Sequence, residues 1–145
     1  MKYLKITLVF ICTLLLSISV VSQINVLSNH NNLRRTGWND KESVLNTQNV
    51  SPSTFTKLFT KSVDDQIYAQ PLIITKVSIA GNLRNIVLVA TVNNSVYAFD
   101  ADNAGTAYWQ KNLTPVGSRV IKNTDMTGAC GGNYKDFSGN MGIVG

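Results

Sequence analysis

Short apolar runs separated by turn residues make up most of the chain, and after residue 22 no stretch repeats apolar residues at helical spacing. Such runs, bounded by Asn, Asp, Ser or Gly, are typical of β-strands. The runs that we expect to form strands are Lys57–Val63, Ile67–Thr75, Asn85–Val92, Ser95–Ala101 and Tyr108–Leu113. Pro71 lies inside the second run, so a central strand there needs a bulge or an unpaired position. The short, regular intervals predict an all-β fold built as an antiparallel meander.

The first 22 residues have a different pattern. A short basic start, Met1–Lys5, precedes an almost unbroken apolar run at Ile6–Val21, and Ser22 follows it. This order is typical of a secretory signal peptide, here cleaved after Ser22. A membrane anchor is the alternative, but a run of 16 residues is near the lower limit for crossing a bilayer and no charged stop-transfer segment follows. We therefore expect residues 1–22 to be removed on export to the periplasm, cell surface or medium, with no membrane span afterwards.

The turn between the third and fourth runs is the dipeptide Asn93-Asn94. Asn tolerates positive φ, which both central residues of a two-residue type I′ hairpin require. A two-residue loop would place Val92 opposite Ser95 and Ala90 opposite Tyr97. The residues then expected on one face are Ile86, Leu88, Ala90, Tyr97 and Phe99. Those expected on the other face are Val87, Val89, Thr91, Val96 and Ala98.

Both faces of this predicted hairpin are apolar. A simple two-layer sandwich usually leaves one face of each sheet polar. A sheet that is apolar on both faces is expected to lie between two others, as the blades of a β-propeller do. The pattern therefore favours a propeller fragment: an entry segment and about one four-stranded antiparallel blade.

One segment, "SVYAFDADNAGTAYWQ" at residues 95–110, resembles the repeat of quinoprotein-like (PQQ-repeat) propellers. In that repeat a strand carries Ala-x-Asp, a turn carries Gly, and Trp begins the next strand. Ala98, Asp100, Gly105 and Trp109 fill these places, in a turn one residue longer than the common form. Asp at a strand end can accept turn N–H groups, Gly supplies positive φ, and Trp buries a large apolar area between sheets.

The resemblance extends over nearly all of residues 25–145. Its parts are an Asn/His cluster before Arg35-Thr36-Gly37, the "L-x-x-x-N-V" of Leu45–Val50, "IYAQPL" at Ile67–Leu72, and the closing "GIVG". It implies that residues 23–145 are the N-terminal part of a secreted bacterial propeller of this superfamily, truncated before the ring closes. The rest of the propeller, beyond Gly145, would then be its first partner.

Three functions are compatible with this resemblance, because a fold alone does not select one. The first is a binding or scaffold propeller at the cell envelope, without a catalytic site of its own in this fragment, whose partner is an envelope protein or a small molecule. The second is a quinone-dependent dehydrogenase, with pyrroloquinoline quinone and calcium held by the full-length protein. The third is an outer-membrane assembly propeller that adds strands to exposed edges. We favour the first, since no catalytic or cofactor-binding set is recognisable in the sequence.

Composition adds mainly exclusions. The 13 basic side chains include Lys2 and Lys5, so the mature chain carries 11 against 8 acidic ones, scattered without a basic-aromatic stripe. Nucleic acid is therefore not an expected partner. Cys130 is the only cysteine after the signal, which excludes a disulfide framework within the fragment.

The remaining candidate residues favour structural roles. His30 is the only histidine and has no companion ligand, so we expect no metal site there. Asp100, Asp102, Asn103 and Gly105 faintly resemble a calcium loop but lack the later Glu. Arg34-Arg35 is expected to tie the entry segment to the first blade. Gly128–Gly139 is expected to be a Gly-rich loop between blades, without the signature of a phosphate loop.

Overall fold

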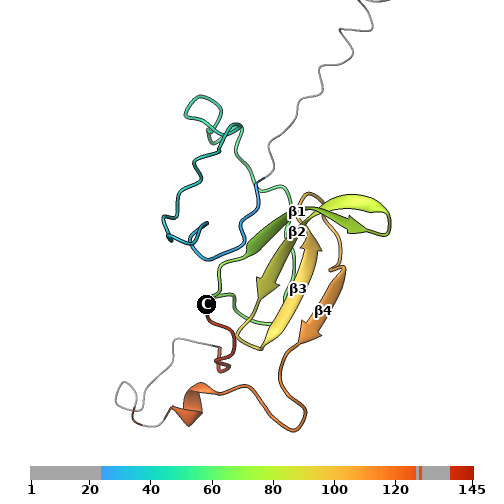
Figure 1. The fold of residues 1–145 in the computed structure, drawn as a ribbon. Helices are drawn as coiled ribbons and strands as arrows, with labels where there is room; N and C mark the ends of the chain where they lie inside the picture. Colours follow the sequence, from blue (N-terminus) through green and yellow to red (C-terminus); the bar gives the residue numbers. More distant parts are fainter. Residues whose placement is uncertain (1–23, 127, 129–137) are drawn as a thin grey trace, which may run out of the picture.

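The fold is built on one four-stranded antiparallel sheet whose strands follow one another in chain order (Figure 1). The computed structural model describes residues 24–126, 128 and 138–145. The elements are β1 (Leu72–Ile79), β2 (Asn82–Ala90), β3 (Ser95–Asp100), β4 (Trp109–Asn112) and a 3-10 turn, η1 (Asn123–Asp125). The described residues contain no α-helix, so the prediction of an all-β chain is confirmed. The predicted signal peptide and Cys130 lie outside the described residues.

The β1–β2 hairpin is longer than the sequence predicted. β1 begins directly after Pro71, so the missing proline N–H falls outside the ladder. The strand then continues to Ile79, which pairs with Asn82 across a two-residue loop. Ala80 and Gly81 have φ values of 49° and 79°, as a type I′ turn requires. The sequence did not predict this turn, because alanine rarely takes positive φ.

The β2–β3 loop, by contrast, is not the predicted two-residue turn. The Thr91 N–H donates to the Ser95 carbonyl at 2.9 Å, which leaves Val92, Asn93 and Asn94 in the loop. Asn94 alone of the three has positive φ, and its N–H donates to the Thr91 carbonyl at 3.0 Å. A turn followed by one left-handed residue is the usual three-residue hairpin. The prediction was wrong because it required positive φ at both asparagines.

The extra loop residue shifts the register of the whole hairpin. Val89 lies opposite Tyr97, where the sequence predicted Ala90, and Leu88 lies opposite Ala98. A one-residue slip exchanges the faces of one strand relative to the other. The predicted division into faces was therefore wrong, although both true faces still carry apolar residues.

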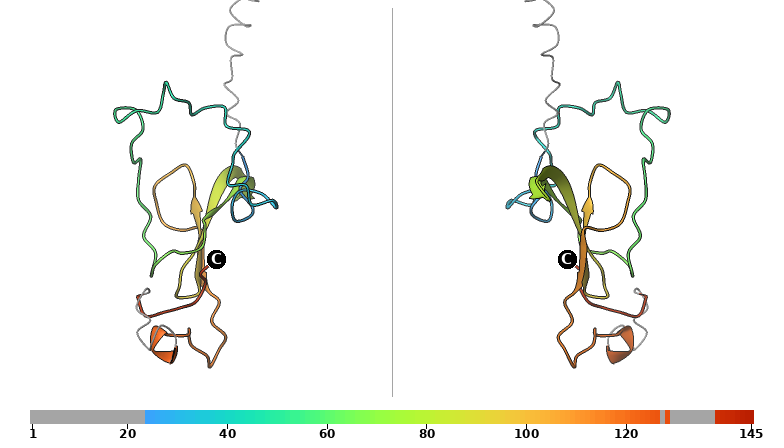
Figure 2. Two further views of the ribbon diagram at one scale, coloured as in Figure 1. Left: turned by 90° about the vertical axis from the view of Figure 1, so that its left-hand side faces the viewer. Right: turned by 90° about the vertical axis from the view of Figure 1, so that its right-hand side faces the viewer.

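One face, which we call the covered face, holds the main hydrophobic cluster of the described chain, although Ile86 and Ala98 are buried on the opposite face. Val89, Tyr97 and Phe99 are buried on the covered face, and Val63, Val87 and Ala107 pack against them. The Tyr97 and Phe99 rings are stacked, with centroids 5.5 Å apart and planes 3° from parallel. Figure 2 shows chain segments from before β1 and from the β3–β4 loop on the same side of the sheet.

Residues 57–63, which we call the strap, run over the covered face. The predicted strand at these positions is wrong as an element of the sheet, because the strap pairs with no strand of the described chain. Its side chains nevertheless alternate. Phe59, Lys61 and Val63 are half-buried, whereas Leu58, Thr60 and Ser62 are exposed. The strap is therefore an extended segment held by its side chains.

The opposite side of the sheet, the open face, has no strap over it. Its residues are Leu72, Ile74, Val77, Ile79, Arg84, Ile86, Leu88, Ala90, Val96, Ala98, Asp100, Trp109 and Lys111. A bulge interrupts the β1–β2 ladder between Ile74 and Val77. Lys76 in the bulge has positive φ, and bulges of this kind bend a strand and increase its twist.

The entry segment, residues 24–56, is attached to the sheet by few contacts. Val26 and Ile73 exchange two backbone hydrogen bonds of 2.9 Å at the outer edge of β1. Asn25 Oδ1 accepts from the Thr75 N–H at 2.7 Å. Most residues of the segment are exposed, and Figure 1 shows it as a wide loop beside the sheet. Its fold rests on short-range side-chain bonds, such as the Leu45 N–H to Glu42 Oε1 at 2.9 Å.

Candidate functional site

Two adjacent carboxylates, Asp64 and Asp65, organise the end of the sheet where β2 turns into β3. Asp64 follows the strap directly. Its carboxylate accepts hydrogen bonds from the side chains of three residues in or beside the β2–β3 loop. Thr91 Oγ1 donates to Oδ1 at 2.8 Å, Asn93 Nδ2 donates to Oδ2 at 2.8 Å, and Ser95 Oγ also donates to Oδ2. We call these residues, with the groups bound to Asp65, the polar hub.

The hub changes the ionisation of its aspartates. Partial burial alone would raise the pKa of Asp64, but the hydrogen bonds from Ser95, Asn93 and Thr91 outweigh it and lower that pKa. The pKa of Asp65 is also lowered, first by its hydrogen bond from Ser138. Both groups are thus held as carboxylates that accept hydrogen bonds. Such a carboxylate is a poor general base, because its oxygens are occupied and its proton affinity is reduced.

Asp65 connects the hub to the last described segment. Ser138 Oγ donates to its Oδ1, and Asn140 Nδ2 donates to its Oδ2 at 3.0 Å. The Gly142 N–H donates to the Val92 carbonyl at 2.7 Å, where a Cβ on Gly142 would lie 2.5 Å from that carbonyl oxygen. Glycine is required at 142 because the two backbones approach so closely. The hub therefore joins the strap, the β2–β3 loop and residues 138–142.

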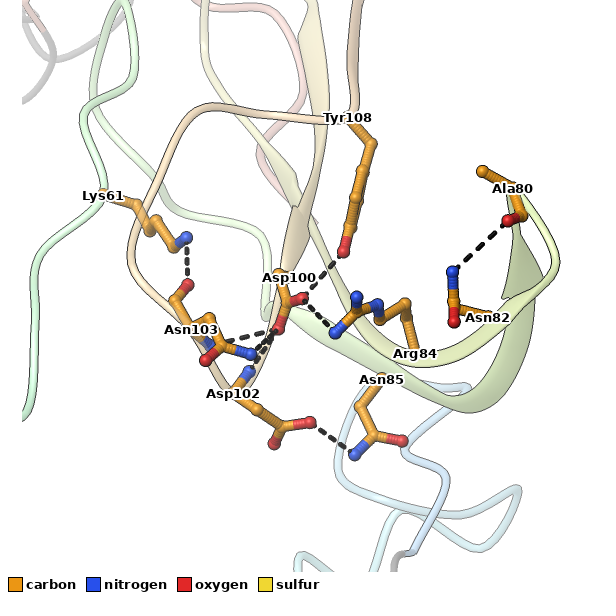
Figure 3. A network of polar contacts seen from close by, with 9 residues as sticks. All are labelled: Lys61, Ala80, Asn82, Arg84, Asn85, Asp100, Asp102, Asn103 and Tyr108. Atoms are coloured by element: carbon orange, nitrogen blue, oxygen red, sulfur yellow. Dashed lines mark hydrogen bonds and ion pairs between the residues drawn. The ribbon is translucent and has the colours of Figure 1, made fainter.

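A second polar network lies at the opposite end of β3, around Asp100 (Figure 3). Oδ1 of Asp100 accepts the N–H groups of Asp102 at 2.9 Å and Asn103 at 3.0 Å. Its Oδ2 accepts from the Tyr108 hydroxyl at 2.7 Å. The Tyr108 bond, together with the turn N–H groups, lowers the pKa of Asp100 to about 2. The carboxylate therefore closes the β3–β4 turn.

Lys61 of the strap holds the other side of the same turn. Its Nζ donates to the carbonyls of Asn103 and Gly105, the latter at 3.2 Å. The ammonium also lies 5.1 Å from the Phe59 ring centre and 5.5 Å from that of Phe99. Figure 3 shows Lys61 reaching the turn from the side opposite Tyr108. The Lys61 ammonium thus binds the strap both to the β3–β4 turn and to the covered face.

The open face carries an apolar groove of about 470 Å³. The β1–β2 hairpin supplies one wall with Val77, Ser78 and Ile79, and Tyr108 and Trp109 supply the other. The floor consists of Ile74, Ile86, Leu88 and Ala98. Trp109 is 49% exposed, although tryptophan carries a large apolar surface. Ser78 and Tyr108 add hydroxyl groups to the walls, but most of the lining is apolar, and such a groove suits an apolar partner surface.

The structure brings the predicted repeat residues close to one another, since Ala98 pairs with Trp109 across β3 and β4, but it separates them from the predicted hairpin residues. Asn93 and Asn94 lie at the hub end of the sheet, whereas Asp100 and Gly105 lie at the opposite end and Trp109 begins β4. Gly105 has φ of 128°, a conformation suited to glycine. Asp102, the other acidic residue of the faint calcium-loop pattern, accepts from Asn85 Nδ2 at 2.7 Å. In the part of the chain that the structure describes, no three His, Cys, Asp or Glu residues are placed to hold a metal ion.

The other candidate residues lie in the entry segment or outside the residues that the structure describes. The His30 N–H donates to Gln70 Oε1 at 2.9 Å, and its carbonyl accepts from the Gly37 N–H at 2.9 Å. Arg35 has positive φ, and its N–H donates to the Asn32 carbonyl at 2.8 Å. Most of the predicted Gly128–Gly139 loop lies outside the described residues.

The sequence pattern did not single out Asp64, Asp65 or Lys61. An adjacent acidic pair directly after an alternating run was the available signal for the hub. Nothing in the sequence paired Asp64 with the β2–β3 loop, because 29 residues separate it from Asn93. No protein family, curated protein or solved structure matches the chain. Across residues 24–126, 128 and 138–145, no helix is both long and apolar enough to cross a membrane.

Proposed function

We propose that this sheet is one blade of an exported quinoprotein-like β-propeller, and that it serves as a binding and scaffold module. Its open groove would pack against the apolar face of a neighbouring β-sheet. One observation carries the proposal: the groove on the open face is lined mainly by apolar side chains, and no segment of the described chain crosses it as the strap crosses the other face. The free energy of the system falls when another apolar surface displaces water from apolar surface of this kind.

The shape of the groove favours a sheet as the partner. Leu88 and Ala98 form a flat floor of small and medium side chains from paired strands, and such a floor suits the side chains of an aligned second sheet. Trp109 and Ile79 stand at the two walls and would pack beside the incoming side chains. The sequence resemblance to propeller blades supports the same arrangement.

Site-specific photocrosslinking in the exporting cell tests this proposal. A benzoylphenylalanine at Leu88 lies on the groove floor, and we expect it to form an adduct with a β-strand peptide, identified by mass spectrometry. The matched control places the same group at Leu33, which is 97% exposed in the entry segment. Adducts at Leu88 with lipid alone, or no adduct beyond the Leu33 background, would contradict the proposal. The same sample reports whether the exported chain begins at Gln23.

A further inference from the structure

Residues 28–38 of the entry segment, which we call the His30 loop, have a strained backbone. His30, Asn31 and Arg35 have positive φ values of 57°, 71° and 54°, although none of them is glycine. Asparagine tolerates this conformation, but three such residues within six positions carry a conformational cost. Residues of this kind persist where the surrounding structure holds them, and they cluster at ligand-binding sites. The strain is thus consistent with a loop that is shaped for a ligand.

Hydrogen bonds close this loop and attach it to the chain just before the sheet. The Gly37 N–H donates to the His30 carbonyl at 2.9 Å. The His30 N–H donates to Gln70 Oε1 at 2.9 Å, two residues before β1 begins. Asn31 Nδ2 donates to the Trp38 carbonyl at 2.7 Å. All of these bonds are made within the chain itself, so they preorganise the loop and reduce the entropy that binding would cost.

A pocket of about 370 Å³ lies between the His30 loop and Gln70. This volume falls within the roughly 300 to 1,000 Å³ that is typical of small-molecule sites. The lining consists of Val26, His30, Asn31, Gly37, Asn39 and Gln70. None of these described residues carries a carboxylate, an ammonium or a guanidinium group, so an ionic ligand would find no permanent opposite charge there.

The bonds that fix the loop also determine which polar atoms of the lining keep no partner within the described chain. Since Gln70 Oε1 accepts the His30 N–H, the unpaired end of that amide is its Nε2 donor. Since Asn31 Nδ2 donates to Trp38, the unpaired end of that amide is its Oδ1 acceptor. A neutral imidazole at His30 adds one donor and one acceptor. The pocket therefore offers donors and acceptors together.

From this combination we propose that the pocket binds a neutral sugar through its hydroxyl groups. A hydroxyl donates one hydrogen bond and accepts others, so it matches a lining with both kinds of atom. An anion without protons would face the Asn31 Oδ1 acceptor unfavourably, and an ammonium would face the Gln70 Nε2 donor unfavourably. Val26 supplies an apolar surface for the C–H groups of the sugar ring.

This site is separate from the groove on the open face, because the two share no lining residue. The inference therefore goes beyond the proposed function and does not depend on it. A failure of sugar binding and a failure of crosslinking at Leu88 are distinct results.

Nuclear magnetic resonance of the full chain tests the proposal, because His30 is the only histidine in the sequence. In a chain produced without a histidine tag, the single imidazole signal reports directly on the pocket. The probes are the methyl glycosides of glucose, mannose, galactose and N-acetylglucosamine. Glycerol, acetate and inorganic phosphate are the comparison compounds, all at constant pH. We expect at least one glycoside to shift the His30 signal saturably and the comparison compounds to leave it in place.

Gln70→Glu should weaken the binding of that glycoside by about tenfold, because it removes the Nε2 donor and keeps an oxygen for the His30 N–H. Gln48→Glu makes the same charge change at an exposed position of the entry segment and should bind as the original chain does. His30→Asn is a second variant in case Gln70→Glu fails to fold, since asparagine tolerates positive φ. Isothermal titration calorimetry should show about tenfold weaker binding for it as well.

Four results would each overturn the assignment. They are no saturable shift with any glycoside, an equal shift with glycerol, a response to acetate or phosphate alone, and unchanged affinity in the folded pocket variants.

Discussion

The two faces of the sheet have similar side chains but different surroundings. The covered face has the strap and part of the β3–β4 loop over it, and Phe99 there is only 3% exposed. The open face has its own aliphatic floor, but Trp109 at its wall is 49% exposed. The difference arises from which segments the chain supplies, since apolar content alone does not distinguish the faces.

This comparison shows what side-chain pattern can and cannot determine. An apolar face indicates that something must cover it, but it does not identify the cover. On the covered face, the cover is a segment that follows the entry segment and is fastened by Lys61 and Asp64. On the open face, we propose that the cover is another sheet.

The largest expected effect is the loss of Phe99. Phe99→Ala removes a buried ring that stacks on Tyr97 and lies beneath the Lys61 ammonium. The free energy of unfolding should therefore fall by about 3 kcal/mol. Trp109→Ala on the open face should cost about half as much, because much of its ring already contacts water. Urea denaturation followed by circular dichroism measures both. Equal losses would show that the two faces are equally covered.

Removal of the hub carboxylate should have the next largest effect. Asp64→Ala leaves the hydroxyls of Thr91 and Ser95, which are almost completely buried, without their acceptor, and we expect a loss of about 2 kcal/mol in unfolding free energy. The strap should loosen at the same time, with faster amide exchange before residue 64. Asp40→Ala, at an exposed position, is the control and should change stability by about 0.5 kcal/mol or less. A variant at Asp64 as stable as this control would contradict a structural role for the hub.

Acid should act at the other end of β3, through Asp100. Its pKa is about 2 in the folded chain against an ordinary 3.8, so it contributes stability above about pH 3.8 that is lost as the pH falls towards 2. Asp125 titrates in the same range, so the pH dependence of stability of the original chain alone does not isolate the effect of Asp100. The difference in stability between the original chain and Asp100→Asn should therefore shrink between pH 4 and pH 2. A difference that stays constant over that interval would rule out this linkage.

The smallest effect concerns the β2–β3 loop. Asn94 has φ of 58°, so Asn94→Gly should be neutral or slightly stabilising, whereas Asn94→Val should cost about 1 kcal/mol. The corresponding pair at Asn93, which is not in the left-handed region, should show the reverse preference. Thermal unfolding of the four variants distinguishes the three-residue loop from the two-residue one.

The sequence predicted the positions of the strands better than the residues that pair across them. The runs that became β2, β3 and β4 were found because their apolar and β-branched content is local information. The register was missed because it depends on which of two neighbouring asparagines takes positive φ, and local composition does not distinguish them. The alternation of the strap predicted a strand, and that alternation is present, but pairing depends on a neighbouring strand that the pattern does not contain.

The polar networks were less predictable for a physical reason. Asp100 caps a turn within three residues of itself, so its role follows from position in the sequence. Asp64 binds groups 27 to 31 residues away, and only the folded sheet brings them within hydrogen-bond distance. Lys61 likewise meets carbonyls more than 40 residues later.

The bulge in β1 acts as a phase shift in the alternation of side chains. Before it, the even-numbered Leu72 and Ile74 point to the open face; after it, the odd-numbered Val77 does so. Without the bulge, a continuous period of two through the same sequence would send Val77 and Ile79 to the covered face. The groove would then lose a wall without any change in composition. The one extra residue of the bulge thus keeps the apolar side chains of both halves of β1 on the open face. A further insertion here would reverse the alternation of the residues that follow, so it should be far less tolerable than a substitution.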